Sequence, residues 1–562
     1  MRNYKMLQKL KQSFLTLLLL ASTLFAADIP DSGSILNEIK PSLKQLEKKA
    51  PPVIPMQEYK APITGDDTLK VLVKKFEIQN NTVFSTEVLH DLIKEYEGKN
   101  LTILEIKKVA DIITKYYRAN GYFVARAYIP VQDLSDNIVR ITVIEGVYGK
   151  FNINNSSKVK ESTIKRYLSE FDNEEVISMD KLERQIFLIN SLSGLQIVNA
   201  EIAPGETVGS SDFTITAEES KRVEGHISMD NYGNKYTGDE RANIGATLNS
   251  PFGYGDALSI YILNSFTDEL KYGRIAYSLP VGSDGVVTNI GLSKLKYTLG
   301  DSYKALDAHG EATLLEAGVS YPIIKTYTRS LDLKGEFVHR VMSDWMSGEK
   351  DKKSIDDFTL SLTSYETMNL FELPSSLLSV ISFTHGHKSL KSQTAETNDA
   401  IVQSEGSFSK ANLNLTHALG FSEKTLLTTR FNAQTSFTRN LDSSQELSVG
   451  GVYGTRAYSD NELSGDKGFF FSTELGYTLP AVQNLLHNMG LFYDTAKIWS
   501  NTNRWAGLSD NTRRLSDIGV SYNASYKSLN FKASYAHGFG SEATPVSQES
   551  RNKFLAQLFW LF

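Results

Sequence analysis

Three charged side chains could meet in the interior of this protein: Arg456, Asp494 and Glu474. Arg456 lies in the polar segment 438–467, whereas both carboxylates lie in segments where polar and apolar residues alternate. Such alternation is typical of a β-strand whose two faces meet different surroundings. A guanidinium withdrawn from water needs an anionic partner that accepts two parallel hydrogen bonds. We therefore expect Arg456 to pair with Asp494, with Glu474 as a second candidate. The alternative is an arginine on an exposed loop that binds nothing.

Signatures of catalysis are absent from the sequence. The 562 residues include no cysteine, which excludes disulfide scaffolds, thiolate metal sites and cysteine nucleophiles. No phosphate-binding loop, G-x-S-x-G elbow or HExxH motif is present. His385 and His387 form the only close histidine pair, and without a third ligand nearby a polar strand end explains them better than a metal site. We expect no enzyme activity, no catalytic residues, no cofactor and no bound metal.

The overall composition is that of a folded protein that does not bind nucleic acid. Hydrophobic residues make up 41% and charged residues 22% of the chain, too apolar for a disordered protein. The 59 lysines and arginines against 65 acidic residues give a net charge of −6, whereas nucleic-acid binders usually carry a basic face. Nucleic acid is therefore not expected as a partner.

Residues 1–26 have the layout of a secretory signal peptide. Basic residues come first, an apolar run from Phe14 to Leu20 follows, and small residues end the segment. The apolar run is too short to cross ~30 Å of hydrocarbon as a helix, and no later segment offers about 18 uncharged apolar residues. We expect an exported chain without a transmembrane helix.

A short amphipathic segment and a tether follow. Residues 27–50 carry apolar side chains at helical spacing, and Pro41 predicts a kink or two short helical pieces. The apolar positions are Ile35, Leu36, Ile39, Leu43 and Leu46. The proline-rich residues 51–68 predict an extended linker. The alternative for residues 27–50 is a mobile tail.

Two tandem units and then a change of pattern organise the rest of the chain. Residues 69–147 and 148–220 each follow the order β-α-α-β-β, and each would leave an open sheet edge that can bind a partner's strand. From residue 221 to residue 562 the helical pattern disappears, and alternating runs of 10–13 residues take its place. Strands of that length cross a bilayer at a tilt.

The connections between these runs favour a membrane barrel. Short turns such as 250–254 and 280–284 alternate with longer loops, of which 438–467 is the longest. Short periplasmic turns and long outer loops are typical of bacterial outer-membrane barrels. We count sixteen antiparallel strands, which predicts an α+β periplasmic part followed by an all-β transmembrane barrel. A soluble β-helix would show a fixed short repeat, and none is visible.

Five strings in the sequence carry a family resemblance. They are YYRANGYFVARAYIPVQ (116–132), VIEGVYG (143–149), LSGLQIVNAEIAPGETVGSSDF (192–213), SMDNYGNKYTGDERANIGATLNSPFGYGDALS (228–259) and SVGGVYGTRAYSDNELSGDKGFFFSTELGYTLP (448–480). The chain resembles the two-partner secretion transporters of the outer membrane, the TpsB family of haemolysin secretion/activation proteins of ShlB/FhaC/HecB type. Under this resemblance residues 69–147 and 148–220 are POTRA units 1 and 2, residues 221–562 are the barrel, and residues 438–467 are the family's loop six.

The resemblance also implies site residues. The family's loop-six motif VRGY stands here as TRAY (455–458), so Arg456 and Tyr458 are kept, and F-x-D-x-G stands as FYDTA (492–496) around Asp494. Residues 27–50 match the helix that plugs the barrel in this family. The POTRA motif falls on Tyr117, Gly121, Tyr122, Pro130, Gln132, Glu145, Gly146, Pro204 and Gly205.

The function that the resemblance implies is protein translocation. A barrel in the outer membrane of a Gram-negative bacterium, with its POTRA units in the periplasm, would pass one large secreted partner to the cell surface. That partner would be a TpsA-type adhesin, haemolysin or toxin. Outer-membrane lipid, periplasmic chaperones and the barrel assembly machinery are the other expected partners. The alternative is an outer-membrane protein insertase of the same superfamily, although such insertases usually carry more than two POTRA units.

Overall fold

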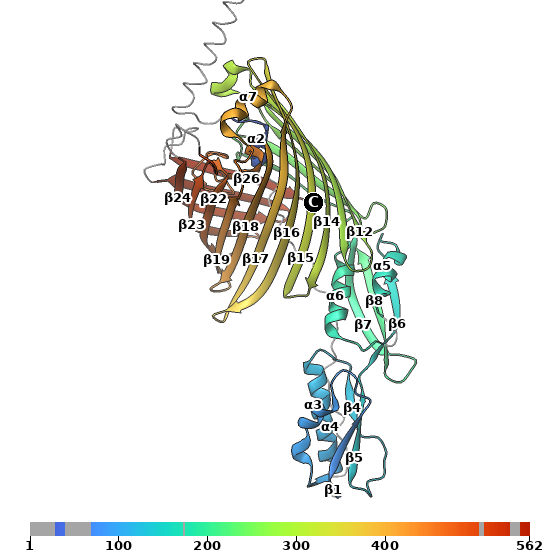
Figure 1. Ribbon diagram of the computed structural model, residues 1–562. Coiled ribbons are helices and arrows are strands. Elements are labelled where there is room, and N and C mark those ends of the chain that lie inside the picture. The colour runs from blue at the N-terminus through green and yellow to red at the C-terminus, as the bar shows by residue number, and fades with distance from the viewer. Residues whose placement is uncertain (1–28, 40–68, 172–174, 505–510, 540–550) are drawn as a thin grey trace, which may run out of the picture.

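The computed structural model describes residues 29–39, 69–171, 175–504, 511–539 and 551–562. Two α/β units hang beneath a wide β-barrel, and a short helix, α2 (Ser32–Glu38), lies toward the end of the barrel remote from them (Figure 1). Several expected features fall outside the described residues, namely the signal peptide 1–26, the linker 51–68, Pro41, Leu43 and Leu46.

The first α/β unit packs one long helix against a small sheet. Its elements are β1 (Lys70–Val73), β2 (Lys75–Gln79), α3 (Thr86–Asp91), the 3₁₀ turn η1 (Lys94–Tyr96), β3 (Lys99–Thr102), α4 (Ile103–Ala119), β4 (Arg126–Tyr128) and β5 (Ile138–Ile144). Strand β5 lies between β2 and β4, and β1 pairs separately with β3. The first strand of this unit, expected to be continuous, is therefore interrupted at Lys74. Helix α4 begins with reciprocal hydrogen bonds between Thr102 and Glu105.

Glu145 is the polar centre of this unit. Its carboxylate accepts hydrogen bonds from the backbone N–H groups of Thr82 (2.7 Å) and Val83 (2.8 Å), from the Thr82 hydroxyl and from the Tyr117 hydroxyl (2.7 Å). Burial opposes ionisation, but these donors outweigh it and lower the pKa of Glu145. The ring of Tyr117 packs edge-on against Phe84. Tyr117 and Glu145, two of the predicted POTRA motif residues, thus connect the segment before α3 with α4 and with the end of β5.

The remaining motif residues shape turns. Gly121 follows α4 at φ +90° and Gly146 follows β5 at φ +83°, a conformation that favours glycine. The Gln132 side chain donates to the carbonyl of Arg140 and accepts from its N–H, both at 2.8 Å, as a neighbouring strand would. Tyr122 packs on Phe84. Gly205 follows Pro204 and donates its N–H to the carbonyl of Ser210.

The second α/β unit repeats the layout and rests on the barrel. Its elements are β6 (Val147–Asn155), α5 (Glu161–Leu168), α6 (Met179–Asn190), β7 (Leu195–Pro204) and β8 (Ser210–Glu219), with β8 between β6 and β7. Arg184 of α6 donates to the carbonyl of Asp284 (3.3 Å), in a turn of the barrel, and to those of Pro322 (2.8 Å) and Ile323 (3.4 Å) near the end of β14. Lys160 lies 3.9 Å from the ring centre of Tyr254 in another turn. The short turns therefore face the two α/β units.

Sixteen antiparallel strands close the barrel, as the alternating pattern predicted. They are β9 (Val223–Asp230), β10 (Arg241–Asn249), β11 (Ala257–Ser265), β12 (Leu270–Val281), β13 (Val286–Thr298), β14 (His309–Lys325), β15 (Arg329–Met346), β16 (Glu349–Leu370), β17 (Leu373–Leu390), β18 (Gly406–Gly420), β19 (Thr425–Ser436), β22 (Lys467–Thr478), β23 (Leu486–Trp499), β24 (Thr512–Tyr526), β25 (Leu529–Gly538) and β26 (Asn552–Leu561). Pairing of β26 with β9 closes the ring, from Gln557 opposite Asp230 to Leu561 opposite His226.

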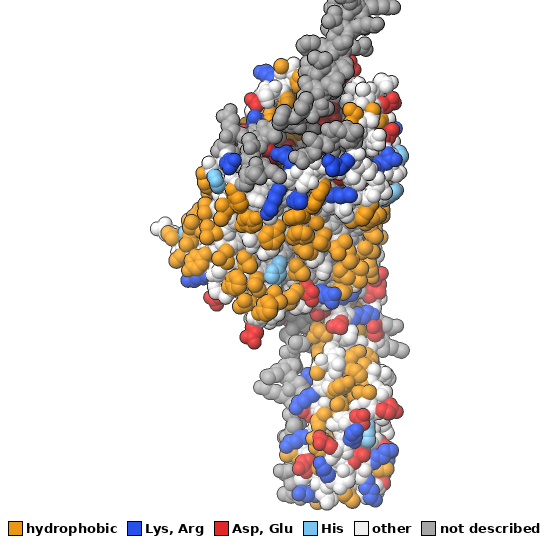
Figure 2. Space-filling view, turned by 60° about the vertical axis from the view of Figure 1, so that its left-hand side comes forward, with side chains coloured by type: hydrophobic (Ala, Val, Ile, Leu, Met, Phe, Trp, Pro, Cys, Tyr) orange, Lys and Arg blue, Asp and Glu red, His pale blue; other side chains and the backbone are white. Residues whose placement is uncertain are grey.

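The outer wall of the barrel is apolar over a continuous band (Figure 2). Residues such as Ile290 and Leu292 on β13 and Phe358 and Leu360 on β16 point outward and are about half exposed. Their neighbours in sequence point into the barrel, as the strand period of two requires. No helix in the described ranges is long and apolar enough to cross a membrane.

Removal of the Glu145 carboxylate should loosen the first α/β unit. Glu145→Ala leaves the N–H groups of Thr82 and Val83 and the buried Tyr117 hydroxyl without their acceptor, and we expect a loss of roughly 3 kcal/mol. Limited proteolysis and hydrogen exchange of residues 69–147 in the full-length protein would measure it. Glu95→Ala, at an exposed position on η1, is the control. Equal protection in both variants would show that Glu145 does not hold the unit together.

Candidate functional site

The segment 438–467 folds back into the barrel instead of extending from its rim. It contains the 3₁₀ turn η3 (Ser443–Gln445) and a small hairpin of β20 (Leu447–Ser448) and β21 (Ser464–Gly465). Arg456 is 5% exposed and Tyr458 is 1% exposed, although both belong to a loop. Both side chains are enclosed by the inner wall and by the loop itself.

Arg456 meets both carboxylates that the sequence analysis named. Its Nε donates to Oδ2 of Asp494 at 2.8 Å and its Nη2 donates to Oδ1 at 3.1 Å, which makes a bidentate pair. Its Nη1 donates to Oε2 of Glu474 at 2.8 Å. The guanidinium also lies 3.2 Å from the ring centre of Phe492. The alternative of an exposed arginine without a partner is therefore wrong.

Tyr458 and Ala457 continue the same contact along the wall. The Tyr458 hydroxyl donates to the carbonyl of Ser516 at 3.3 Å, and its ring fills the space above Gly538, where a Cβ would come within 2.8 Å of the hydroxyl oxygen. The N–H of Ala457 donates to Asp517 at 3.1 Å. Ala457 does not have a positive φ, so an alanine in place of the family's glycine fits here without strain.

Two wall carboxylates lie directly opposite each other at this contact. Asp494 and Asp517 are register partners on β23 and β24, and neither side chain has measurable exposure. Like charges in adjacent buried positions repel, so the cation of Arg456 offsets part of their interaction. The alternation of inward and outward residues along the strand predicted that Asp494 faces the lumen, but Asp517 was not among the predicted site residues. A second aspartate on the next strand was the signal that could have found it.

Helix α2 forms a second contact inside the barrel. Asp31 caps the helix and pairs with Lys353 on β16 at 2.8 Å, while Ser32 donates its N–H (2.9 Å) and its hydroxyl (2.8 Å) to Asp344 on β15. Burial opposes ionisation of Asp31, but the Lys353 ammonium holds its pKa below the usual range. Lys353 also pairs with Asp442 at 2.8 Å. The start of α2, the barrel wall and the start of the folded-in loop thus share one cation.

The far end of α2 is held by neutral donors. Glu38 accepts from Nδ2 of Asn234 at 2.8 and 2.9 Å and from Nδ2 of Asn461 at 3.0 Å. Ile35 within α2 and Ile39 just after it are buried among apolar residues of the inner wall, while Leu36 packs at their edge. Burial, reinforced by repulsion from Asp460, raises the pKa of Glu38 to about 8. Of the predicted plug positions, Ile35, Leu36 and Ile39 therefore contact the lumen wall.

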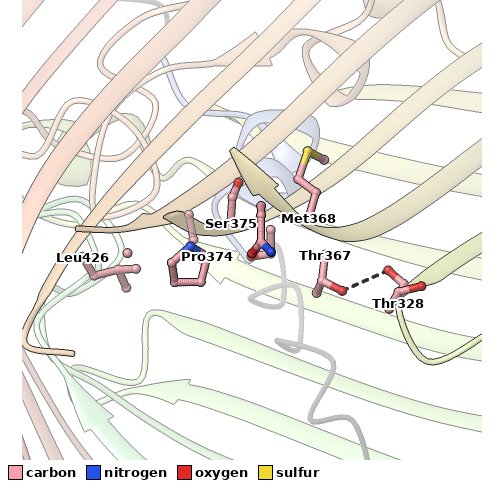
Figure 3. Close-up of a pocket in the computed structure, with 10 residues that line it drawn as sticks. Thr328, Thr367, Met368, Pro374, Ser375 and Leu426 are labelled. Atoms are coloured by element: carbon pink, nitrogen blue, oxygen red, sulfur yellow. Dashed lines mark hydrogen bonds between the residues drawn. The ribbon is translucent and has the colours of Figure 1, made fainter. Parts of the chain in front are cut away.

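A concavity of about 530 Å³ opens on the inner wall near the turns that face the α/β units (Figure 3). Figure 3 shows Thr367, Pro374 and Leu426 along its edge, with Thr367 donating to the carbonyl of Thr328 at 3.2 Å. Its lining residues are uncharged and mostly small. It lies apart from the Arg456 contact, toward the opposite end of the strands.

The histidine pair lies on the outer face of β17. His385 and His387 point outward from β17 and contact the hydroxyls of Ser409 (2.9 Å) and Ser407 (3.1 Å). Among the described residues, no group of three or more His, Asp or Glu side chains could hold a metal ion.

Two family models match the chain. Residues 71–146 match the family model of the ShlB-type POTRA domain, so the first α/β unit is a periplasmic module attached to an outer-membrane barrel transporter. Residues 209–540, more than half of the chain, match the model described as haemolysin secretion/activation protein ShlB/FhaC/HecB. The chain belongs to this family of two-partner secretion transporters, which pass an exoprotein partner across the outer membrane.

Relatives and solved structures agree with this assignment. The heme/hemopexin transporter protein HuxB of Haemophilus influenzae is 28% identical over 553 residues, with 96% of each chain covered. The hemolysin transporter protein ShlB of Serratia marcescens is 24% identical over 420 residues, covering 73% of this chain and 72% of the relative. The structure of CdiB from Escherichia coli superposes with a TM-score of 0.72 at 19% identity, covering 90% of this chain and 92% of the other. At this identity the structural likeness supports the fold alone.

Docking of α2 should weaken as pH rises. The docked state raises the pKa of Glu38 from 4.5 to about 8, so that state binds a proton more tightly than the released state does. Its stabilisation is complete below pH 4.5 and is lost as pH rises toward 8. We expect open-channel conductance in planar bilayers to increase between pH 5 and pH 8, and Glu38→Gln to flatten this dependence. The same pH slope in both proteins would contradict the assignment to Glu38.

Proposed function

We propose that the contact of Arg456 with Asp494 and Glu474 holds the folded-in loop in the secretion-competent position, and that α2 closes the lumen at rest. The observation that carries this proposal is that both elements lie inside one barrel and meet at Asp442 and Lys353. A barrel that exports protein needs an interior filled at rest and cleared during transport. Elements held by polar contacts at the lumen wall can leave without breaking the strand ladder.

Capture of the partner is proposed to occur at a sheet edge of the second α/β unit, which we assign as POTRA 2. Strand β7 is ten residues long and pairs with β8 on one side only. An extended segment can add to such an edge through main-chain hydrogen bonds. The first unit offers shorter edges, β2 with five residues and β4 with three, and Gln132 occupies part of the edge beside β4.

The uncharged concavity near the periplasmic turns supports a path from β7 into the lumen. A wall of threonine, serine, proline and small apolar side chains offers few strong contacts to any one sequence. Such a surface suits a passing unfolded chain that must not be retained. HuxB is named a heme/hemopexin transporter, so an exoprotein for heme or hemopexin is the first cargo to test. An adhesin, haemolysin or toxin remains the broader class.

Loss of the Arg456 guanidinium should impair secretion. Arg456→Ala leaves Asp494 and Asp517 buried without their cation, which typically costs 3–5 kcal/mol at the contact. We expect secretion of the cognate exoprotein to fall at least tenfold while the barrel still assembles, and Arg456→Lys to restore only part of it because a lysine cannot pair bidentately. Heat-modifiable mobility on gels would report barrel assembly. Arg329→Ala, at an exposed periplasmic strand end, is the control. Normal export by Arg456→Ala would refute the lock.

Release of α2 should open the pore. Deletion of residues 28–60, or the point change Lys353→Gln, is expected to raise single-channel conductance in planar bilayers, because both remove the ion pair that holds Asp31. Lys334→Gln, at another inward-facing lysine, paired to Glu336 of its own strand, is the matched control. Unchanged conductance in the deletion would mean that α2 is not the plug. Closed channels in every variant would favour the insertase function.

Edge addition at β7 can be tested by cross-linking, because the chain contains no native cysteine. Val198→Cys on β7 is expected to form disulfides with single-cysteine variants of the secreted partner, whereas Lys165→Cys on the exposed face of α5 should not. Equal cross-linking at both positions would argue against recognition through the strand edge.

A further inference from the structure

The outer wall of the barrel carries most of its cations at one end. Above the apolar band, on the side remote from the α/β units, the strands point a row of basic side chains outward: Lys271, Lys294, Lys296, Lys350, Lys352, Lys467, Lys497 and Arg514. We call this row the cationic rim. Figure 2 shows blue side chains along this border of the apolar band.

Strand parity places these side chains on the lipid-facing wall. Lys294 and Lys296 share the face of Ile290 and Leu292 on β13, which are 54% and 50% exposed. On β23, Lys497 shares the face of Leu491, which is 64% exposed. Each cation therefore stands beyond the end of an apolar row, at the height of the lipid headgroups.

The opposite border of the band lacks such a row. At the periplasmic ends of the described strands, Arg329 is the outward-facing cation, and it lies directly opposite Glu366 on β16. The long side chain of a lysine can extend to the headgroup region of either leaflet. Side-chain length therefore does not explain why the cations gather at one border of the apolar band. The asymmetry matches a membrane whose outer leaflet is more anionic than its inner leaflet.

Within the rim, a groove of about 360 Å³ lies across β12 to β15. Lys271, Lys296, His309 and Trp345 line it, and His309 stacks on the Trp345 ring at 5.3 Å. Three carboxylates border the groove: Asp268 pairs with Lys271 (2.6 Å), Glu311 pairs with Lys294 (3.3 Å) and Glu269 follows Asp268 in the loop. The ammonium of Lys296 is exposed in a groove wide enough for a phosphorylated sugar headgroup.

We propose that the cationic rim, centred on Lys294 and Lys296, binds the phosphate groups of the lipid that forms the outer leaflet, a phosphorylated glycolipid of lipid A type. The apolar band below the groove is in contact with the acyl chains, and the ammonium groups above it meet the phosphates. Lys294 and Lys271 exchange part of their carboxylate pairing for phosphate when the lipid is bound. Binding would anchor the wall of β12 to β16, which includes the strands that hold Asp31 and Ser32 of α2.

The test uses full-length protein in phosphatidylcholine nanodiscs that contain bisphosphorylated lipid A or its dephosphorylated form, with retained lipid counted by native mass spectrometry. A lysine near an anionic surface typically strengthens binding about fivefold. We therefore expect Lys294→Gln/Lys296→Gln to weaken binding of bisphosphorylated lipid A at least tenfold and to leave the dephosphorylated lipid unchanged. The control pair, Lys424→Gln/Lys527→Gln, changes exposed lysines in periplasmic turns and should bind like the wild type.

Heat-modifiable mobility confirms that each variant is folded. Unchanged binding in a folded Lys294→Gln/Lys296→Gln protein would overturn the proposal. An equal loss of both lipids would also overturn it, because the groove would then recognise acyl chains and not phosphate. If Lys424→Gln/Lys527→Gln lost as much lipid A binding as Lys294→Gln/Lys296→Gln, the loss would reflect the change in net charge and not the position of the lysines, which would also overturn the proposal. Reduced secretion with unchanged lipid binding would assign the rim to the exported protein instead.

Discussion

The filling of the lumen at rest depends on one contact, in which carboxylates of the barrel wall surround the guanidinium of Arg456. A sixteen-stranded barrel has an interior too wide for its own inward side chains to fill, so segments from outside the wall must occupy it. A polar loop can do so only if its donors and acceptors find partners there. Arg456 supplies the strongest of these, because it binds Asp494 bidentately, reaches Glu474 and stacks on Phe492. Tyr458 and Ala457 then align the loop along β24 and β25.

Local pattern was sufficient to predict the barrel, whereas the pairing of Arg456 with Asp494 was predicted largely from the family resemblance. The period of two fixes which face a residue occupies, so the alternation of polar and apolar residues alone puts Asp494 and Glu474 on the inward face. What periodicity could not predict was the contact between segments far apart in the chain. Asp31 and Lys353 are more than 300 residues apart, and neither lies in a motif. The break at Lys74 was missed for a similar reason, since both halves of residues 69–78 have the same strand-like pattern.

The two occupants of the lumen are coupled through shared residues. Asp442 belongs to the folded-in segment, and Lys353 joins it to the cap of α2, while Asn461 of the same segment donates to Glu38 at the other end of the helix. Movement of the segment would therefore remove partners from both ends of α2 at once. Because the folded-in segment and α2 depend on the same few contacts, we expect them to leave the lumen together.

The joint between the second α/β unit and the barrel has an evolutionary consequence. Arg184 recognises the backbone carbonyls of Asp284, Pro322 and Ile323. Every residue type presents the same carbonyl group, so substitutions at Asp284 and Ile323 should leave the joint intact, whereas Gly285, at φ +84°, has no room for a Cβ beside Leu188 of α6. Insertions or deletions would instead shift the carbonyls out of reach. Among relatives, the lengths of the turn at Asp284 and of the end of β14 should therefore vary much less than their sequences.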